Sequence, residues 1–233
     1  MSTGSFEVEL IAREALSARV HRLRCRARAP FRWAAGQYIV VARARELGEE
    51  LNLPYSIASA YDPKQPGEFE IAASYHAGAD AIDALSVGAT LVIEGPRGSF
   101  TWREDASPAA LLVGVGTGVA PLRALIQEEL ARPTATRLVL LAGHRAPDDV
   151  LFERDFAQFA AEYARFEFVP TLTGEAEHWL GRRGRVQTQL ATAVSALGRF
   201  DAYVCGRVDM VHEVRAALDL LGVPPERVRS EGY

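Results

Sequence analysis

Up to about Arg103, apolar and polar side chains alternate with a period of two. In His21–Arg28, apolar residues at every second position alternate with four arginines, the pattern of a strand with one buried and one solvated face. The arginine row could instead be an anion site, but outward alternation favours a solvated sheet face. Five more strands and one short helix are predicted: Phe6–Leu10, Tyr38–Ala42, Tyr55–Ala58, Phe69–Ser74, Thr90–Glu94 and the helix Asp80–Leu85. Many short strands with one helix predict a small antiparallel β-barrel.

After Ala106–Pro108, continuous apolar runs replace the alternation, and helical spacing appears between them. Buried strands are predicted at Ala109–Val113, Leu138–Ala142, Phe166–Pro170 and Tyr203–Cys205. Apolar residues three and four apart predict helices after them, including segments at Leu122–Leu130, Leu151–Tyr163, Val186–Val194 and Met210–Leu221. Strands that alternate with helices predict a parallel, doubly wound sheet. We therefore expect two domains, an antiparallel barrel over residues 1–105 and a doubly wound α/β domain over residues 106–233.

The composition narrows the class of partner. With 233 residues, 48% of them hydrophobic, the chain can bury two modest cores, and its charge of −4 gives no reason to expect nucleic acid or an anionic membrane. Cys25 and Cys205 lie far apart and the histidines are scattered, so no metal centre, iron–sulfur cluster or disulfide framework is expected. Because Met1–Glu14 has no apolar core and no apolar run reaches the roughly 20 residues that span a bilayer, we expect a cytoplasmic protein without membrane insertion.

A glycine-rich turn, Gly-Val-Gly-Thr-Gly-Val-Ala-Pro, follows the first buried strand at Gly114–Pro121. Glycines let the backbone pass close to a pyrophosphate, and the helix after them offers unpaired N–H groups to its charge. Pro121 suits the first turn of that helix, where its missing N–H costs nothing. The string differs from the usual Rossmann fingerprint, whose third glycine follows the second by three residues. It nevertheless indicates a nicotinamide-nucleotide site more strongly than a plain tight turn.

A second motif, Leu-Pro-Tyr-Ser-Ile-Ala-Ser at Leu53–Ser59, resembles the flavin-binding signature arginine-any-tyrosine-serine of the ferredoxin–NADP reductase superfamily. Gly114–Pro121 resembles the nicotinamide loop of the same superfamily. Three more stretches are similar to it and lie in the same order: Gly95–Phe100, Tyr203–Gly206 as the last strand, and Pro225–Tyr233. The chain is closest in appearance to bacterial single-chain NAD(P)H:flavin reductases in three segments: Trp179, Gly181–Val186 and Cys205–Arg207.

The resemblance implies roles for individual residues. Catalytic roles would fall to Ser56, whose hydroxyl reaches flavin N5, to Cys205 beside the nicotinamide, and to Tyr233, which covers one flavin face. Tyr55 would pack against the isoalloxazine, and Thr117 would flank the nicotinamide opposite Cys205. The remaining cofactor-binding residues implied are Ile57, Ala72, Gly78 and Ala79 for flavin, and Gly116, Gly118, Val119, Gly143, Arg145, Gly206 and Met210 for the nucleotide. No metal ligand is implied.

Each of three assignments has a plainer alternative. Taken alone, Tyr55 could be an aromatic at the barrel rim, Cys205 a small buried hydrophobe and Tyr233 a disordered terminus. Two positions also depart from the family pattern: Leu53 replaces the arginine that pairs with flavin phosphate, and Ala79 replaces a serine or threonine. A charged hydrogen bond is worth about 1.5–3 kcal/mol. We therefore expect flavin to be held chiefly by its ring, as loosely bound FAD or as dissociable FMN or riboflavin.

The resemblance implies a flavin-dependent NAD(P)H oxidoreductase. Hydride would pass from nicotinamide C4 to flavin N5, and electrons would leave to free flavin or to a partner redox protein. The donor would be NADH or NADPH; Glu175 and Glu177 favour NADH because like charge repels a 2′-phosphate, although Arg182, Arg183 and Arg185 could offset them. Two alternatives stay open: an electron-transfer subunit of a multicomponent oxygenase or other redox complex, and a non-catalytic member that has lost its flavin.

Overall fold

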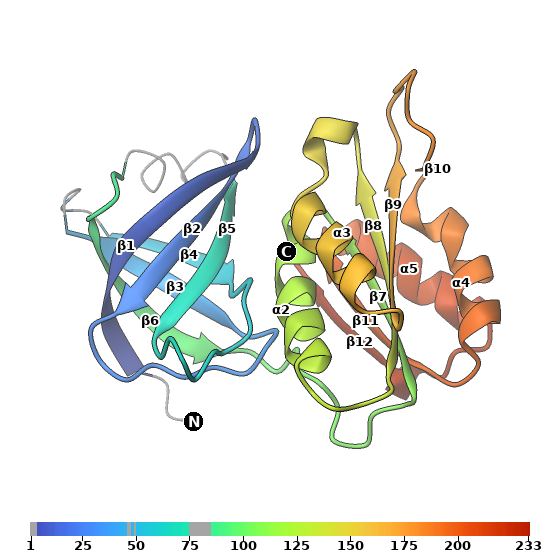
Figure 1. Cartoon of the computed structure of the whole chain (residues 1–233), viewed down its shortest axis with the longest axis horizontal. Coiled ribbons are helices and arrows are strands. Elements are labelled where there is room, and N and C mark those ends of the chain that lie inside the picture. Colours follow the sequence, from blue (N-terminus) through green and yellow to red (C-terminus); the bar gives the residue numbers. More distant parts are fainter. Residues whose placement is uncertain (1–3, 46–47, 49, 75–84) are drawn as a thin grey trace.

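The computed structural model describes residues 4–45, 48, 50–74 and 85–233, whose strands form two six-stranded sheets side by side (Figure 1). Gly78, Ala79 and the predicted helix from Asp80 as far as residue 84 lie outside the described residues. The first sheet, on the left in Figure 1, is called the barrel below, and the second sheet with its helices is called the α/β unit.

The barrel is built from antiparallel strands in the order β4-β3-β6-β1-β2-β5. Its strands are β1 (Gly4–Ser17), β2 (Val20–Ala27), β3 (Tyr38–Ala44), β4 (Glu50–Ser56), β5 (Glu68–Ser74) and β6 (Thr90–Arg97). An isolated bridge between Ile57 and Ile71 links the chain beyond β4 to β5, so the sheet curls back on itself. The inward-facing positions fill a core that includes Leu10, Leu23 and Ile39. This confirms the predicted antiparallel barrel.

The arginines of β2 do not share one solvated face. Arg24 has a half-exposed side chain and pairs with Glu70 on the neighbouring strand at 3.2 Å. The side chain of Arg22 is only 14% exposed, because it lies against the α/β unit, where Asp155 accepts a hydrogen bond of 2.6 Å. The prediction of a solvated face is therefore wrong at Arg22, since the period of a strand does not reveal what packs on the sheet.

The α/β unit contains a parallel sheet in the order β10-β9-β8-β7-β11-β12. Its strands are β7 (Ala109–Val115), β8 (Arg137–His144), β9 (Phe166–Leu172), β10 (Arg182–Arg183), β11 (Asp201–Gly206) and β12 (Val228–Gly232). Helices α2 (Val119–Leu130) and α3 (Glu153–Glu162) cover one face, and α4 (Leu190–Leu197) and α5 (Val208–Leu220) cover the other (Figure 1). The predicted doubly wound sheet is confirmed.

Four details differ from the pattern-based expectations. The strand predicted at Tyr55–Ala58 spans Glu50–Ser56 instead. The helix predicted to begin at Leu151 begins at Glu153, because Phe152 has φ +56° and cannot continue a right-handed helix. Strand β11 is not the last strand, as the Tyr203–Gly206 motif implied, because β12 pairs beside it. Both edge strands of the parallel sheet, β10 with 2 residues and β12 with 5, are too short to show a repeating pattern of apolar residues in the sequence.

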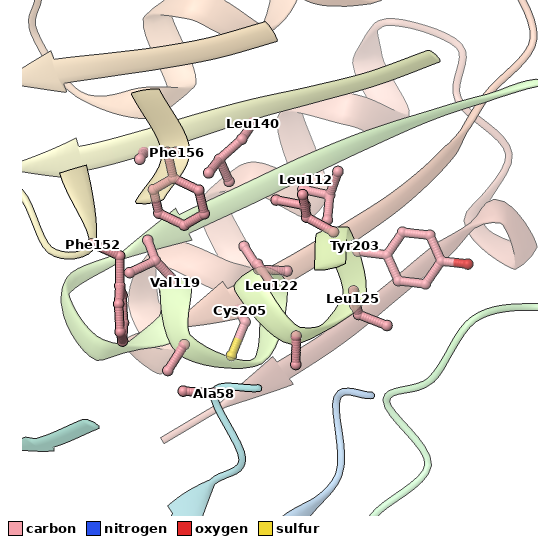
Figure 2. Packing of buried hydrophobic residues seen from close by; sticks show 14 of the residues in the cluster. Ala58, Leu112, Val119, Leu122, Leu125, Leu140, Phe152, Phe156, Tyr203 and Cys205 are labelled. Carbon is pink, nitrogen blue, oxygen red and sulfur yellow. The ribbon is translucent and has the colours of Figure 1, made fainter. Parts of the chain in front are cut away.

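Helix α2 forms the contact between the barrel and the α/β unit. Ala35, Ala58 and Ala72 of the barrel belong to the same buried cluster as Leu122 and Leu125 of α2. Figure 2 shows Ala58 reaching toward the start of this helix. The segment between β6 and β7 crosses this junction, so the site described next lies between two units with a shared core.

Candidate functional site

The glycine loop Gly116–Gly118 lies at the carboxyl end of the parallel sheet, packed directly onto β11. A Cβ on Gly118 would overlap the carbonyl oxygen of Cys205, so this approach requires glycine. Gly116 has φ +52° and open space where its side chain would be. Gly118 is the N-cap of α2 and offers no side chain to its first N–H groups. The N–H of Val119 donates to the carbonyls of Gly116 and Thr117, so the loop itself forms a short 3-10 turn at the start of a helix that has no side-chain cap.

Cys205 and Gly206 end β11 beside this loop. Cys205 is fully buried, and burial raises the pKa of its thiol, an effect that the nearby Glu231 carboxylate reinforces. The thiol is therefore neutral near pH 7. Gly206 has φ +150°, and a Cβ there would lie 2.7 Å from Met210 Cε and from Val115 Cγ2. Met210 thus closes the space behind Gly206.

The C-terminal strand brings Tyr233 to the same place. The Tyr233 backbone N–H donates to the carbonyl of Gly206 at 3.2 Å, and its phenol oxygen lies 2.7 Å from Thr117 Oγ1, within hydrogen-bond distance. Tyr233 is an ordered part of the site, with 58% of its surface exposed. The structure therefore gathers Thr117, Cys205 and Tyr233, three residues far apart in sequence.

On the barrel side, Tyr55 and Ser56 end β4, and both are half-buried. Burial raises the pKa of the Tyr55 phenol to about 12, so it remains a neutral hydrogen-bonding group. Ile57 is fully buried in the barrel core and Ala72 is buried at the junction. Their side chains face the interior, which leaves only their backbone groups for contact with a ligand.

Gly98, on the segment that joins the two sheets, lies where the barrel and α/β groups meet. It has φ +96°, and a Cβ there would lie 3.0 Å from a ring carbon of Tyr38 and 3.9 Å from Glu231 Oε2. Tyr38 is the β3 residue opposite Ser56, whereas Glu231 is the β12 residue opposite Cys205. Gly98 therefore lies between one residue paired with the end of β4 and one residue paired with the end of β11. Burial raises the pKa of Glu231.

Sequence reasoning had not singled out Tyr38 as a site residue, and neither had it assigned a role to Arg229. The guanidinium Nη1 of Arg229 donates to the carbonyls of Ser99 at 3.1 Å and Thr101 at 3.2 Å, which ties β12 to the connecting segment. In the sequence, Arg229 could have been noticed because it lies within the Pro225–Tyr233 motif. Only the fold shows which carbonyls it reaches.

The end of β8 supplies a third group next to the glycine loop. A Cβ on Gly143 would lie 2.8 Å from Val186 Cγ1 and 3.0 Å from Val115 Cγ1, so the chain is closely packed there. Arg145 is exposed, and its carbonyl accepts the N–H of Gly174 at 2.8 Å. Between them, His144 is buried, and burial lowers its pKa to about 4. In the sequence, His144 could have been noticed because it lies between Gly143 and Arg145, which the resemblance implies in nucleotide binding.

Among the described residues around Leu53, the barrel offers little to a flavin phosphate. Leu53 packs against the barrel core. Nearby arginines have carboxylate partners, Arg43 with Glu50 at 3.2 Å and Arg97 with Glu94. Within the described ranges, no group of three His, Cys, Asp or Glu side chains could hold a metal ion. In the same part of the chain, no helix is both long and apolar enough to cross a bilayer.

Two family models match the chain, one in each unit. The oxidoreductase FAD-binding domain matches residues 7–102, and the oxidoreductase NAD-binding domain matches residues 112–216. Among curated proteins, "Ferredoxin--NADP reductase B" of Sorangium cellulosum is 34% identical, over 98% of this chain and 97% of the relative. "NAD(P)H-flavin reductase" of Aliivibrio fischeri is 27% identical, over 87% of this chain and 86% of the relative.

Solved structures share the fold. The ferredoxin reductase in carbazole 1,9a-dioxygenase superposes with a TM-score of 0.86 at 22% identity, over 100% of this chain and 70% of that one. The flavohem-like FAD/NAD binding domain of nitric oxide dioxygenase from Vibrio cholerae superposes with a TM-score of 0.82 at 19% identity, over 98% of both chains.

Proposed function

The chain belongs to the ferredoxin–NADP reductase superfamily, and we propose that it oxidises NADH and reduces a flavin held mainly by its ring system. It is an oxidoreductase composed of an FAD-binding and an NAD-binding region. As part of the proposal, residues 1–105 serve the flavin and residues 106–233 serve the nucleotide. The proposal also places the protein in the cytoplasm, which its two free, buried cysteines support.

The observation that carries the proposal is the junction at Gly98, which lies between Tyr38 of the barrel and Glu231 of the α/β unit. Ser56 is the strand partner of Tyr38, and Cys205 is the strand partner of Glu231, so residues proposed for the two cofactors flank this junction from different units. The residues present fit the two cofactors: a crowded glycine loop leads into an uncapped helix, and a tyrosine-serine pair ends a barrel strand. When bound, the flavin accepts hydride at N5 from C4 of the reduced nicotinamide.

The chain's own residues would bind and orient these groups. The Ser56 hydroxyl is proposed to donate a hydrogen bond at flavin N5, and Tyr55 to pack on the ring. The neutral Cys205 thiol and Thr117 would bracket the nicotinamide, and the glycine loop Gly116–Gly118 at the start of α2 would lie against the pyrophosphate. Tyr233 occupies the space beside Thr117 and must leave it when the nicotinamide enters. Gly143, Arg145, Gly206 and Met210 are proposed to complete the nucleotide pocket.

We propose free flavin as the electron acceptor, because Leu53 offers no cation to retain a phosphorylated flavin. The alternative acceptor is a partner redox protein. One observation favours it: a Ralstonia reductase component of naphthalene 1,2-dioxygenase/salicylate 5-hydroxylase systems is 29% identical, over 92% of this chain and 64% of that protein. A stable flavin complex that does not exchange with added flavin would favour this alternative.

The test is the visible spectrum of the purified protein with added FMN, riboflavin or FAD, recorded without oxygen before and after NADH. We expect the flavin absorbance to bleach within seconds and to return when air is admitted. Ser56→Ala should retain flavin yet slow the bleaching on the order of 100-fold, because a hydrogen bond to the developing charge is lost. No bleaching of any flavin by NADH or NADPH would contradict the function.

A further inference from the structure

Four charged side chains are buried together where the barrel meets α2 and α3. Arg22 and Glu70 come from the neighbouring strands β2 and β5, Arg123 comes from α2, and Asp155 comes from α3. The side chains of Arg22 and Asp155 are 14% and 20% exposed, and those of Arg123 and Glu70 are 6% and 10% exposed. Two cations and two anions therefore compensate one another here, and the more exposed Glu14 and Arg24 pair with Arg22 and Glu70 at the edge of the cluster.

Arg123 is the centre of this cluster. Its Nε donates to Asp155 Oδ2 at 2.6 Å, and its Nη1 donates to Glu70 Oε2 at 2.9 Å. The same Nη1 donates to the backbone carbonyl of Ala58 at 2.6 Å. One guanidinium thus joins α2 to α3, to β5 and to the chain just beyond β4. A planar group with several fixed donors is needed for this, and lysine provides a single nitrogen.

The ring of Phe152 supports the two arginines. The guanidinium carbons of Arg123 and Arg22 lie 4.9 Å and 5.0 Å from its centroid, within the range of cation–π attraction. Phe152 is buried and has φ +56°, a backbone conformation that bulky side chains rarely adopt. Strain of this kind persists only where the surrounding contacts hold it in place. The cluster is therefore a built part of the junction and differs from a surface ion pair.

Arg123 also stands between the two groups of proposed site residues. It lies in α2 one turn beyond Val119, where the helix leaves the glycine loop. Through the carbonyl of Ala58 it holds the chain two residues beyond Ser56. Ala58 and Cys205 belong to the same buried cluster as the first turns of α2. The Arg123–Ala58 hydrogen bond is thus a short connection between the nucleotide loop and the end of the flavin strand.

A second connection lies further along α2. The side chain of Gln127 accepts the backbone N–H of Ala60 at 3.0 Å, and that of Glu128 accepts the backbone N–H of Ala35 at 3.1 Å. These contacts fix the direction of the helix against the barrel. Arg123, being nearest to the glycine loop, fixes the position of its first turns.

We propose that Arg123 is a positioning residue for hydride transfer, which holds the glycine loop at a set distance from the flavin-facing end of β4. This rests on the proposed function, in which Ser56 and Thr117 face the two reacting rings. Hydride transfer needs reacting atoms about 3–3.5 Å apart, and a displacement of about 1 Å costs about 100-fold in rate. Because Arg123 is buried at the junction and lies outside the proposed ring contacts, it controls the rate of transfer more than the affinity for either cofactor.

Stopped-flow reduction of bound flavin by NADH, with and without deuterium at C4, compares the wild type with Arg123→Met and Arg123→Lys. We expect Arg123→Met to lower the limiting hydride-transfer rate by about 10- to 100-fold, with dissociation constants for flavin and NADH within about threefold. Arg123→Lys should recover part of the rate, because it keeps the charge and one hydrogen bond. The isotope effect identifies the measured step as hydride transfer.

Arg165→Met is the matched control. Arg165 is also largely buried, but it donates to the carbonyls of Glu129 and Thr136 within the α/β unit. Its loss should lower the Tm and leave the transfer rate unchanged. Asp155→Asn is the second variant, used if Arg123→Met does not fold. It removes the charge of one partner of Arg123 with little change in size, and it should slow hydride transfer by a smaller factor than Arg123→Met.

The outcomes are distinguishable. A folded Arg123 variant with the wild-type transfer rate overturns the positioning role, and so does an equal loss of rate in Arg165→Met. If Arg123→Met does not fold, a wild-type rate in Asp155→Asn overturns it as well. A wild type whose flavin is not reduced by NADH contradicts the proposed function itself and is recognised before any variant is compared.

Discussion

At the scale of single residues, the hydrogen bond between Thr117 and Tyr233 connects the C-terminus to the proposed nicotinamide pocket. The two oxygens lie 2.7 Å apart, and the Tyr233 N–H is bound to Gly206. A terminal residue held at both its backbone and its side chain is not a free tail. In our proposal the nicotinamide enters beside Thr117, so Tyr233 would compete with that ring.

Tyr233→Phe removes the hydrogen bond but keeps the ring. We expect NADH to bind about two- to tenfold more tightly, because a net hydrogen bond of about 0.5–1.5 kcal/mol no longer opposes its entry. A chain ending at Gly232 should bind NADH more tightly still and retain flavin less well, since about 0.5–1.5 kcal/mol of ring–ring attraction is also lost. Stopped-flow titration measures both affinities. Unchanged flavin affinity, NADH affinity and transfer rate in both variants would make Tyr233 a bystander.

Leu53 is a residue-scale test of how flavin is held. We expect Leu53→Arg to tighten FMN and FAD by about 10- to 150-fold and leave riboflavin unchanged, because a charged hydrogen bond of about 1.5–3 kcal/mol acts only on a phosphate. Fluorescence titration of the three flavins measures this. Leu53→Met, neutral and similar in volume, is the control and should change none of them. Equal tightening of riboflavin would show that the effect does not come from the phosphate.

His144 makes the stability depend on pH. Burial lowers its pKa to about 4, whereas an unfolded histidine has a pKa of about 6.5. The unfolded state therefore takes up the proton first, so the contribution of His144 is fully present above about pH 6.5 and is lost as the pH falls toward 4. Between pH 7.5 and pH 5, we expect the wild type to lose about 2 kcal/mol more stability than His144→Gln in urea unfolding. Equal losses would contradict this assignment.

At the scale of elements, the sequence predicted what depends on local pattern. The period-two strands of the barrel and the apolar strands of the α/β unit were found because each repeats its burial over several residues. Thr117 and Cys205 could be proposed as site residues because their motifs are local. Arg123 was not singled out, because its partner Ala58 lies 65 residues away in the sequence. Tyr38 was not singled out, because only the strand pairing places it opposite Ser56. The edge strands β10 and β12 were not predicted as strands, because they are too short to show a period.

The segment after β9 governs the choice of nicotinamide in our proposal. The hydroxyl of Thr173 donates to the carbonyl of His144, and Arg183 donates to the carbonyls of Ala176 and Trp179. Arg185 pairs with Glu213 at 3.3 Å. Thr173 and Arg183 are thus engaged within the protein, which leaves the exposed Arg182 and Arg185 as the arginines that would have to offset Glu175 and Glu177.

We therefore expect a kcat/KM for NADH at least about tenfold above that for NADPH, because a 2′-phosphate near Glu175 and Glu177 meets like charge. Replacing both glutamates with glutamine should narrow the ratio by raising kcat/KM for NADPH alone. Steady-state kinetics at constant ionic strength measure both values. A higher kcat/KM for NADPH in the wild type would show that the arginines of this segment outweigh the glutamates.

At the scale of the whole molecule, the barrel and the α/β unit share one interface rather than meeting through a linker. Barrel alanines lie in the buried cluster of α2, the charged cluster around Arg123 spans the two units, and Trp102 Nε1 donates to the carbonyl of Leu125 at 3.1 Å. Separating the units would expose this apolar surface and leave buried charges without partners. Such a separation is strongly unfavourable.

We therefore expect the two units to unfold together. In a Trp179→Phe background, the remaining tryptophans, Trp33 and Trp102, lie in the barrel and at the junction. Circular dichroism at 222 nm instead follows the described helices, which all lie in the α/β unit. The two signals should give one Tm, because a two-state transition looks the same to every probe.

Gly36 offers a way to disturb this junction from the barrel side. It has φ +91°, and a Cβ there would overlap the carbonyl oxygen of Phe100, close to Leu125 of α2. Gly36→Ala should cost at least about 2 kcal/mol and lower the Tm of both signals by about 4–8 °C. Gly48→Ala, also at positive φ but with nothing within 4 Å, is the matched control and carries only the backbone strain. If the tryptophan signal alone moved, the barrel would unfold independently, and a contact such as that of Arg123 could not hold the two cofactor sites in register.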